Sequence, residues 1–484
     1  MLIDLHLRTR QVHLFPILLA IAVLLSAAYF GHRPSILWLE LMTAGTAGLI
    51  LLNRPVWGLV ILVLSTLILP IEFGTGTEVK LNPASLLIPV LLAIWVLDML
   101  GRSQLRLASS PANRPLALFL TASLLSLIIG RATWDPLVPV GGSFLIVQLA
   151  QWAIFAFSAG AFWLTANLIQ DEIWLRRLTV IFLISGGMLA MLRLFPNLGV
   201  QVNRFTTIAF IRAPLWTLLA ALAGGQLLWN HRLSVAWKLF LIAILFTGLY
   251  YGFFINRESA STWVGIGAAL GVLIWLRFPR LRWPLVIIVL LLAFLGELFS
   301  AVYEFAGGDD DWAGTGEPRL VLIGRVIEVT MRNPVTGLGP AAYRLYANTK
   351  PLIYAHIFWA APRVSSHNNY VDLFSHGGLL GLALFFWSAI SIALLGLRLR
   401  RKYQYGFAAG YINGMLAAGA ASLILMLFAD WILPFVYNIG FPGFQASVLV
   451  WLFLGGLVSL DRIDKEAEFR NADCLTPELP AERQ

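Results

Sequence analysis

Apolar stretches recur along the whole chain, and they restrict the fold more than any other feature. Each stretch holds about 17 to 25 residues, enough for a helix to cross roughly 30 Å of hydrocarbon. The 484 residues are 59% hydrophobic and 12% charged, a balance that excludes a soluble globular domain. The sequence therefore predicts an all-α polytopic membrane protein.

We predict about twelve to fourteen membrane-spanning helices. The second, third and fifth segments have the weakest patterns, so the count of fourteen has twelve and thirteen as alternatives. The segments are 13–30, 34–52, 55–71, 84–100, 115–130, 144–168, 178–195, 213–230, 237–254, 260–276, 284–302, 377–396, 405–428 and 444–460.

The spans divide the chain into four parts, with no internal repeat. Residues 1–302 hold eleven spans, 303–376 form one long loop, 377–460 hold three spans, and 461–484 form a polar tail that we expect to be disordered. The lone cysteine, Cys474, excludes a disulfide within the chain.

Most of the 34 lysines and arginines fall on one side when the N-terminus is placed in the cytoplasm. Both termini are then cytoplasmic and the long loop is external. This orientation places Arg204, Arg212 and Arg257 at outer span ends, where the positive-inside rule disfavours cations. We interpret them as candidate phosphate ligands, the alternative being that they reach headgroups or pair with acids such as Glu258.

The long loop contains two predicted helices. The first begins at Thr315-Gly316-Glu317-Pro318 and ends near Arg332, with Leu320, Ile323, Ile327 and Met331 on one apolar face. Arg319 in its first turn and Arg325 further along are candidate anion ligands. The turn Gly337-Leu338-Gly339-Pro340 leads into the second helix, from Ala341 to about Asn348.

Two features of this loop could carry chemistry. Asp309-Asp310-Asp311 either binds a divalent cation or forms a solvated loop, and because consecutive carboxylates point in different directions we expect no metal site. His367, followed by Asn368, Asn369 and Tyr370 just before an apolar helix, could accept a proton from a hydroxyl, or it could serve only local hydrogen bonding. The role of His376 stays open between structure and function.

These residues resemble the motifs of the O-antigen ligase and polymerase superfamily, membrane enzymes that act on undecaprenyl-diphosphate-linked glycans. The resemblance rests on the histidine–asparagine pair before a tyrosine and a glycine-spaced helix, and on arginines in the preceding segments. In this chain these motif residues are His367, Asn368, Asn369, Tyr370, Gly378, Gly381, Arg319, Pro334, Gly337, Gly339, Arg257, Arg204 and Pro214. The chain departs from the family pattern at His376, where an acid is usual, at Glu258, where a small residue is common, and at Leu215, where an asparagine often occurs.

The resemblance implies a GT-C-like glycosyltransferase of the bacterial inner membrane, with an external active site and neither cofactor nor metal. Arginines would hold the donor diphosphate: Arg204, Arg257 and Arg319, with Arg212 and Arg325 as further candidates. His367 would deprotonate the acceptor sugar hydroxyl, Asn368, Asn369 and Tyr370 would support it, and transfer would invert the anomeric carbon.

Two other functions remain open at this point. The chain could be an anion transporter of the bicarbonate-carrier type, although we see neither repeats nor broken spans. It could also be a non-catalytic subunit of a polysaccharide export complex. The sequence does not separate ligase from polymerase or identify the sugars, and it predicts membrane lipid but no nucleic acid as a partner.

Overall fold

A computed structural model describes residues 48, 51–76, 79–103, 107–257, 259–294, 319–349, 352–354, 357–359 and 365–475. Contacts divide the chain into two units, Met1–Pro55 and Val56–Gln484. The architecture below is that of the second unit.

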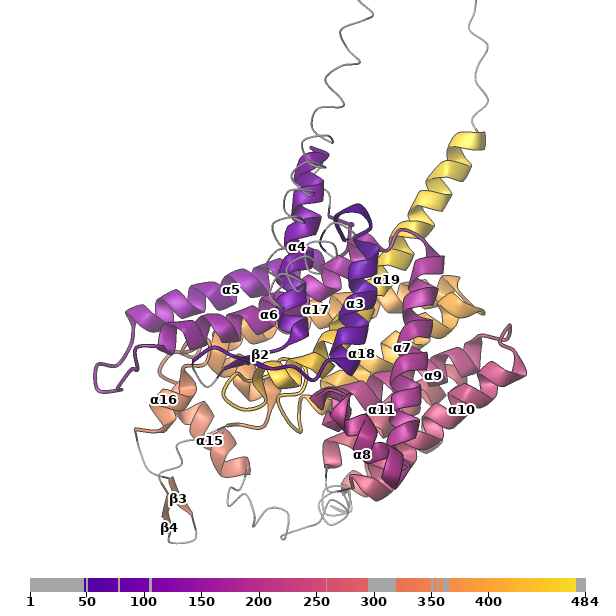
Figure 1. The fold of residues 1–484 in the computed structure, drawn as a ribbon. Helices are drawn as coiled ribbons and strands as arrows, with labels where there is room; N and C mark the ends of the chain where they lie inside the picture. The colour runs from indigo at the N-terminus through magenta and orange to yellow at the C-terminus, as the bar shows by residue number, and fades with distance from the viewer. Residues whose placement is uncertain are drawn as a thin grey trace, which may run out of the picture. The chain divides into compact units, whose positions relative to one another are not determined.

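The first half of this unit is a series of helices joined by short connections (Figure 1). In chain order its elements are α3 Val56–Ile68, β1 Phe73–Gly74, β2 Lys80–Leu81, α4 Pro83–Gly101, α5 Asn113–Ala132, α6 Phe144–Leu168, α7 Glu172–Arg193, α8 Pro196–Arg204, η1 Ile208–Ile211, α9 Ala213–Trp229, α10 Val235–Tyr250, η2 Tyr251–Ile255, α11 Ala260–Arg277, η3 Pro279–Leu281 and α12 Arg282–Phe294.

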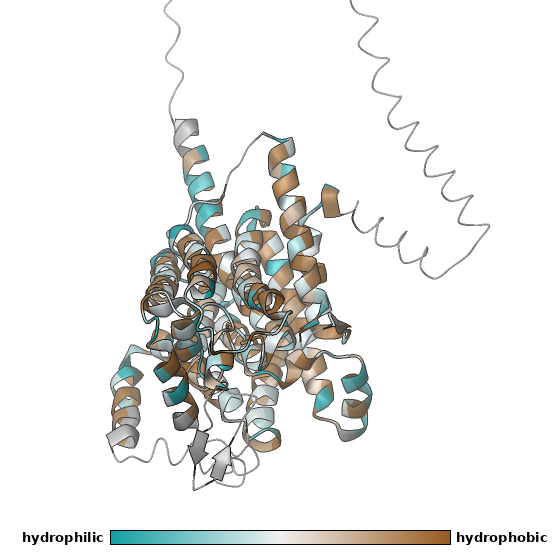
Figure 2. Cartoon of the chain, turned by 90° about the vertical axis from the view of Figure 1, so that its left-hand side faces the viewer, coloured by the Kyte–Doolittle hydropathy of each residue, from teal (hydrophilic) through white to brown (hydrophobic). Residues whose placement is uncertain are grey.

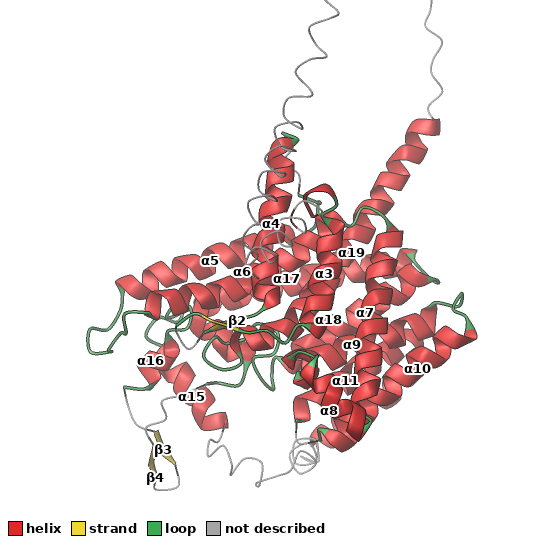
Figure 3. Ribbon diagram, in the orientation of Figure 1, coloured by secondary structure: helices red, strands yellow, loops and turns green. Residues whose placement is uncertain are grey.

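The second half contains the long loop and three long helices. Its elements are α15 Arg319–Thr330, α16 Tyr343–Ala347, β3 Leu352–Tyr354, β4 Ile357–Trp359, α17 Asn369–Lys402, α18 Phe407–Leu425 and α19 Gly440–Leu475. The strands pair only as two small antiparallel hairpins, β1 with β2 and β3 with β4 (Figure 3).

The fold is that of an all-α polytopic membrane protein. Within the described ranges, eight helices are long and apolar enough to cross a membrane, and three shorter apolar helices accompany them. Apolar residues recur along the helices (Figure 2), and many of them are exposed; Leu239, Phe246 and Phe254 on α10 and η2, for example, are 62%, 65% and 72% exposed. Such exposure is stable only against lipid.

Each predicted span from residue 55 onward coincides with a helix, although α12 is described only to Phe294. The predicted span 13–30 and most of 34–52 lie outside the described residues, as do the start of the predicted 315–332 helix and Asp309 to Asp311.

Small residues allow the central helices to approach closely. A Cβ on Gly225 of α9 would lie 2.3 Å from the Gly410 carbonyl oxygen of α18, and one on Gly414 would lie 2.9 Å from the Ala221 carbonyl oxygen. Neighbouring α19 is the most enclosed span, with 94% of its most apolar window buried. Close backbone packing of α9 on α18 thus builds the centre of the bundle.

The loop helix α15 corrects one prediction from periodicity. Its buried residues are Leu322, Arg325, Val326, Val329 and Thr330, whereas Ile327 and Met331, expected on the apolar face, are 39% and 60% exposed. The helix carries two apolar stripes, and the one that packs beside α17 was not the one predicted.

For residues 461–475 the prediction of a disordered tail is wrong, because α19 continues as a helix to Leu475; residues 476–484 lie outside the described residues. Ion pairs hold its extension against the end of α17. Asp461 accepts from Arg398 at 2.6 Å, and Lys402 reaches both Asp464 and Glu468 at 2.5 Å. Charge that suggests disorder in a sequence instead forms a paired helical surface.

The bundle has two ends with different contents. At one, which we call the His367 end, the Asn369 amide donates to the Met426 carbonyl, joining the start of α17 to the end of α18, and the Thr207 amide donates to the Leu67 carbonyl. At the other, the Trp229 end, the Gly406 amide donates to the Trp229 carbonyl. Because α7, α10 and α18 run from the Trp229 end to the His367 end, the two are separated by the length of these helices.

Candidate functional site

A tight loop before α17 presents His367 at its end of the bundle. The Ser366 hydroxyl donates to the Asp372 carboxylate at 2.7 Å and accepts from the Asn368 amide at 3.0 Å. Asn368 in turn caps α17 by accepting from the Tyr370 and Val371 amides. These bonds hold His367 at φ 48°, a left-handed conformation that non-glycine residues rarely adopt.

Asn369 ties this loop to the segment between α18 and α19. Its buried carboxamide oxygen accepts from the Ile432 and Leu433 amides at 3.0 and 3.1 Å, and its nitrogen donates to the Leu433 carbonyl at 2.8 Å. The Asn369 side chain thus pairs with the backbone of the 426–439 segment as a neighbouring β-strand would. The sequence predicted a supporting role for Asn369 but not this partner.

The 426–439 segment carries a buried carboxylate, Asp430. It accepts from the Phe435 amide at 2.8 Å and from the Asn438 carboxamide at 2.6 Å. Burial raises the pKa of Asp430, and the nearby charge of His367 opposes this rise. His367 and Asp430 lie in the two segments that the Asn369 side chain joins.

Arg212 is the residue directly before α9. Burial lowers the pKa of Arg212, while the charge of Asp430 opposes the shift. The Arg212 guanidinium lies 5.6 Å from the centre of the Trp431 ring. Its buried Nε has no hydrogen-bond partner within the described residues. A cation with an unused buried donor is able to bind an anion.

The predicted glycine motifs form one structural joint. Gly378 breaks α17 with φ 65°, and the Leu379 and Leu380 amides donate to the Pro334 and Val335 carbonyls. A Cβ on Gly378 would lie 2.2 Å from the Val335 carbonyl oxygen, and one on Gly337 would lie 2.6 Å from the Gly378 amide nitrogen. Only glycine allows this approach. The turn 334–339 therefore fixes the long loop onto α17.

Tyr343 and His376 pack inside the same end of the bundle. The Tyr343 ring stacks on Phe435 at 4.6 Å and on His376 at 5.7 Å, and its hydroxyl donates to Asp372 at 2.9 Å. Burial raises the pKa of Tyr343 well above its usual value. His376 is 2% exposed among aromatic rings, and neither ring nitrogen bonds a described residue. His376 thus belongs to the packing beneath the site.

The remaining predicted residues occupy the same end with different surroundings. Arg204 ends α8 and Arg257 follows η2, and both side chains are exposed. Arg325 is 8% exposed and pairs with Glu328 at 2.6 Å, so its charge is compensated locally. Arg319 begins α15, but its side chain lies outside the described set. The Tyr370 hydroxyl donates to the Leu423 carbonyl at 2.6 Å, a structural contact.

An apolar cavity of about 260 Å³ lies between α11, α17, α18 and α19. Met426 and Ile432 line it close to Asn369, whereas Leu276 and Leu397 line it towards the Trp229 end. The cavity therefore begins beside the loop that carries His367 and extends along the membrane-spanning helices. It offers space for an aliphatic chain whose polar end lies near His367.

Sequence reasoning missed Asp430, Trp431 and Asp372, and it also missed Arg193. Arg193 ends α7, lies 5.1 Å from the Phe210 ring centre and donates to the Thr206 hydroxyl at 3.5 Å. A signal for Asp430 existed, because it is an acid two residues after the apolar segment 405–428 and four residues before Pro434. Over the described part of the chain, no cluster of three or more metal-ligating side chains occurs.

Comparison with known families gives one result. Residues 241–386 match the family described as O-antigen ligase. The matched segment includes Arg257, the Gly337 turn and His367, and it excludes Arg212 and Asp430. No curated protein matches the chain. The match confirms the resemblance inferred from the sequence.

Proposed function

We propose, from this chain's place in the O-antigen ligase and polymerase superfamily, that it transfers a glycan from an undecaprenyl-diphosphate-linked donor to a sugar hydroxyl. Two placements beside an apolar cavity support the proposal. Arg212 lies over Trp431, the neighbour of Asp430, and Asn369 ties the loop of His367 to the same segment. A lipid-linked diphosphate needs both features, because its chain stays in hydrocarbon while its charge requires cations.

Arg212 is the arginine best placed to hold the diphosphate. Its guanidinium is partly desolvated, and the buried Nε donor is unused. Interactions of a guanidinium with phosphate strengthen in such surroundings, where they stabilise charge that develops on a leaving diphosphate. Arg204 and Arg257 are exposed cations at the same end and would complete the clamp, with Arg319 contributed by the long loop. The ion pair with Glu328 leaves Arg325 without a role in this proposal.

His367 serves as the general base. Its imidazole takes the proton of the acceptor hydroxyl as the hydroxyl oxygen attacks the anomeric carbon, and the bond from that carbon to the diphosphate oxygen breaks. The Asp430 carboxylate would stabilise the imidazolium that forms, as a positioning residue and not as a proton acceptor. General base catalysis supplies about 10²–10⁴-fold in rate.

The test is turnover of a defined lipid-linked glycan by purified, folded protein. His367→Ala and Arg257→Ala should each abolish product, while Arg102→Ala at the opposite end, paired with Asp98 in the wild type, should retain it. Full activity in both site variants would eliminate the mechanism. Ladders of product would indicate a polymerase, and single transfer a ligase.

An anion transporter makes a different prediction, namely uptake of labelled anion into vesicles that Arg204→Ala abolishes. Within the described chain the polar residues above gather at one end of the bundle instead of lining a path through it. The site therefore favours transfer chemistry over transport.

A further inference from the structure

A second cavity, with more polar residues in its lining, lies at the Trp229 end of the bundle. Its volume is about 690 Å³, and it lies between α7, the α9–α10 connection and the start of α18. The proposed glycan transfer uses none of its residues. We propose that this cavity binds the phosphodiester headgroup of an anionic membrane phospholipid.

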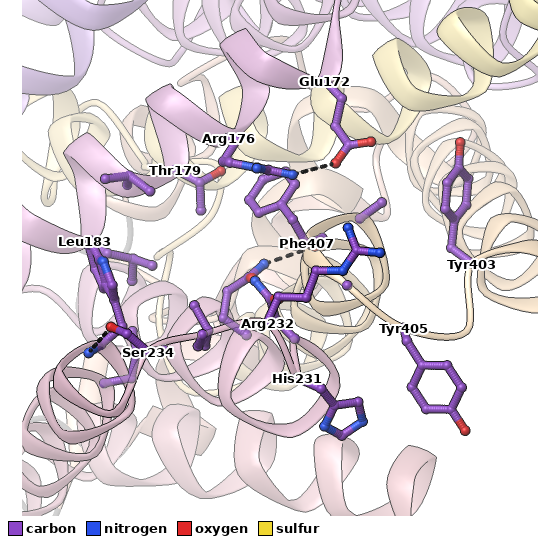
Figure 4. A pocket seen from close by; sticks show the side chains of 18 residues that line it. Glu172, Arg176, Thr179, Leu183, His231, Arg232, Ser234, Tyr403, Tyr405 and Phe407 are labelled. Atoms are coloured by element: carbon purple, nitrogen blue, oxygen red, sulfur yellow. Dashed lines mark hydrogen bonds and ion pairs between the residues drawn. The ribbon is translucent and has the colours of Figure 1, made fainter.

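Two arginines supply the charge. Arg176 and Arg232 both line the cavity, and Figure 4 shows them around the same opening with Tyr403 and His231. Glu172 is the one carboxylate in the lining, and it pairs with Arg176 at 3.2 Å. With His231 neutral the lining keeps one net positive charge, which matches the single charge of a phosphodiester.

Aromatic rings line the cavity around Arg176 in the manner of a membrane interface. The Arg176 guanidinium lies 5.3 Å from the centre of the Phe407 ring, and His231 lies 5.2 Å from Tyr405. Tyr403 and Trp237 also line the cavity. Such amphipathic rings concentrate at the depth of lipid headgroups.

The lining changes from polar to apolar along the helices. On α7 it runs from Arg176 through Thr179 and Val180 to Leu183, and on α10 it runs from Trp237 to Leu241. Residues of the same helices beyond the cavity remain exposed and apolar, including Met188 at 50% and Ile242 at 48%. A phosphate held at the mouth would therefore direct its acyl chains along the surface between α7 and α10. This gradient favours a lipid over a free phosphate compound.

The test is lipid binding by the full chain in nanodiscs or mild detergent, measured by native mass spectrometry. Phosphatidylglycerol should remain bound to the protein in the mass spectrum, whereas phosphatidylcholine should not. The combined change Arg176→Gln with Arg232→Gln should weaken phosphatidylglycerol binding about tenfold or more, as expected for lost charge-assisted bonds. The matched control is Arg102→Gln, which also removes an arginine paired with an acid four residues away and should leave binding unchanged.

Three outcomes would overturn the inference. The double variant could bind phosphatidylglycerol as the wild type does, or phosphatidylcholine could bind equally well. Soluble glycerol phosphate or inorganic phosphate could bind as tightly as the lipid, which would identify a water-soluble ligand instead. Because the readout is binding at the Trp229 end, failure here leaves the proposed transfer reaction untouched.

Discussion

The side chain of Asn369 offers the sharpest test of how the site is assembled. Replacing Asn369 by alanine removes three side-chain hydrogen bonds between the start of α17 and the 426–439 segment. The Ile432 amide and both backbone groups of Leu433 would then remain without this partner in a buried setting.

The size of the effect follows from these contacts. Each lost hydrogen bond reduces stability by about 1 kcal/mol, and more where the partner stays buried and unsatisfied, so the variant should lose about 3 kcal/mol or more. Alanine favours the helix over asparagine by only about 0.6 kcal/mol, too little to offset the loss. Turnover of the variant that remains folded should also fall, because the same segment carries Asp430, whose charge interacts with that of His367.

The assay is unfolding of the purified protein in bicelles by titration with denaturing detergent, paired with turnover of a lipid-linked glycan. Gln404→Ala, a truncation of an exposed amide at the opposite end, provides the control and should change neither. A loss below about 1 kcal/mol, the size of one hydrogen bond, together with normal turnover would refute the reasoning.

Three further changes test separate parts of the structure. Gly378→Ala should destabilise the protein by about 1–3 kcal/mol from backbone strain alone, and the clash with Val335 should add to this loss. Gly377→Ala, where a Cβ has open space, should be nearly neutral. Equal melting temperatures for the two variants would contradict the proposed packing of the 334–339 turn on Gly378. Arg212→Gln should weaken binding of a polyprenyl diphosphate about tenfold or more. Arg131→Gln removes an arginine that also lies over an aromatic ring, that of Phe144, and should leave the affinity unchanged. Equal affinities of the two variants would exclude Arg212 from the diphosphate clamp. Asp430→Asn should flatten the dependence of stability on pH. Because burial raises the folded-state pKa of Asp430 above 3.8, the folded chain keeps a proton that the unfolded chain loses, and this contribution to stability disappears as pH rises through the folded-state pKa. The unfolding free energy of the wild type should therefore fall relative to the variant above pH 3.8, and parallel pH profiles would contradict the assignment.

Much of the fold was predictable because a membrane span is a local property of the sequence. A run such as 144–168 is long and apolar whatever surrounds it, and the helix α6 has those bounds. The joint between Gly337 and Gly378 was visible only as two separate motifs, since the close contact of their backbones depends on how distant segments pack. The apolar face of α15 was assigned to the wrong stripe for the same reason.

The site shows the same division. His367 and its asparagines were identified from a local motif, whereas Asp430 lies 63 residues later and meets His367 through the bonds of Asn369. Long-range partners of this kind leave no periodic signal in a single sequence. The prediction of disorder from Asp461 onward was wrong for a different reason. The charges there pair with the basic end of α17 and stabilise a helix as far as Leu475.

The most direct test of the account is single-turnover transfer by His367→Gln at saturating lipid-linked donor, with donor binding measured on the same sample. The His367→Gln variant should bind the donor as the wild type does but transfer glycan at least about 10²-fold more slowly, while His231→Gln at the opposite end should transfer normally. Transfer by His367→Gln at the wild-type rate would contradict the assignment of His367 as the base.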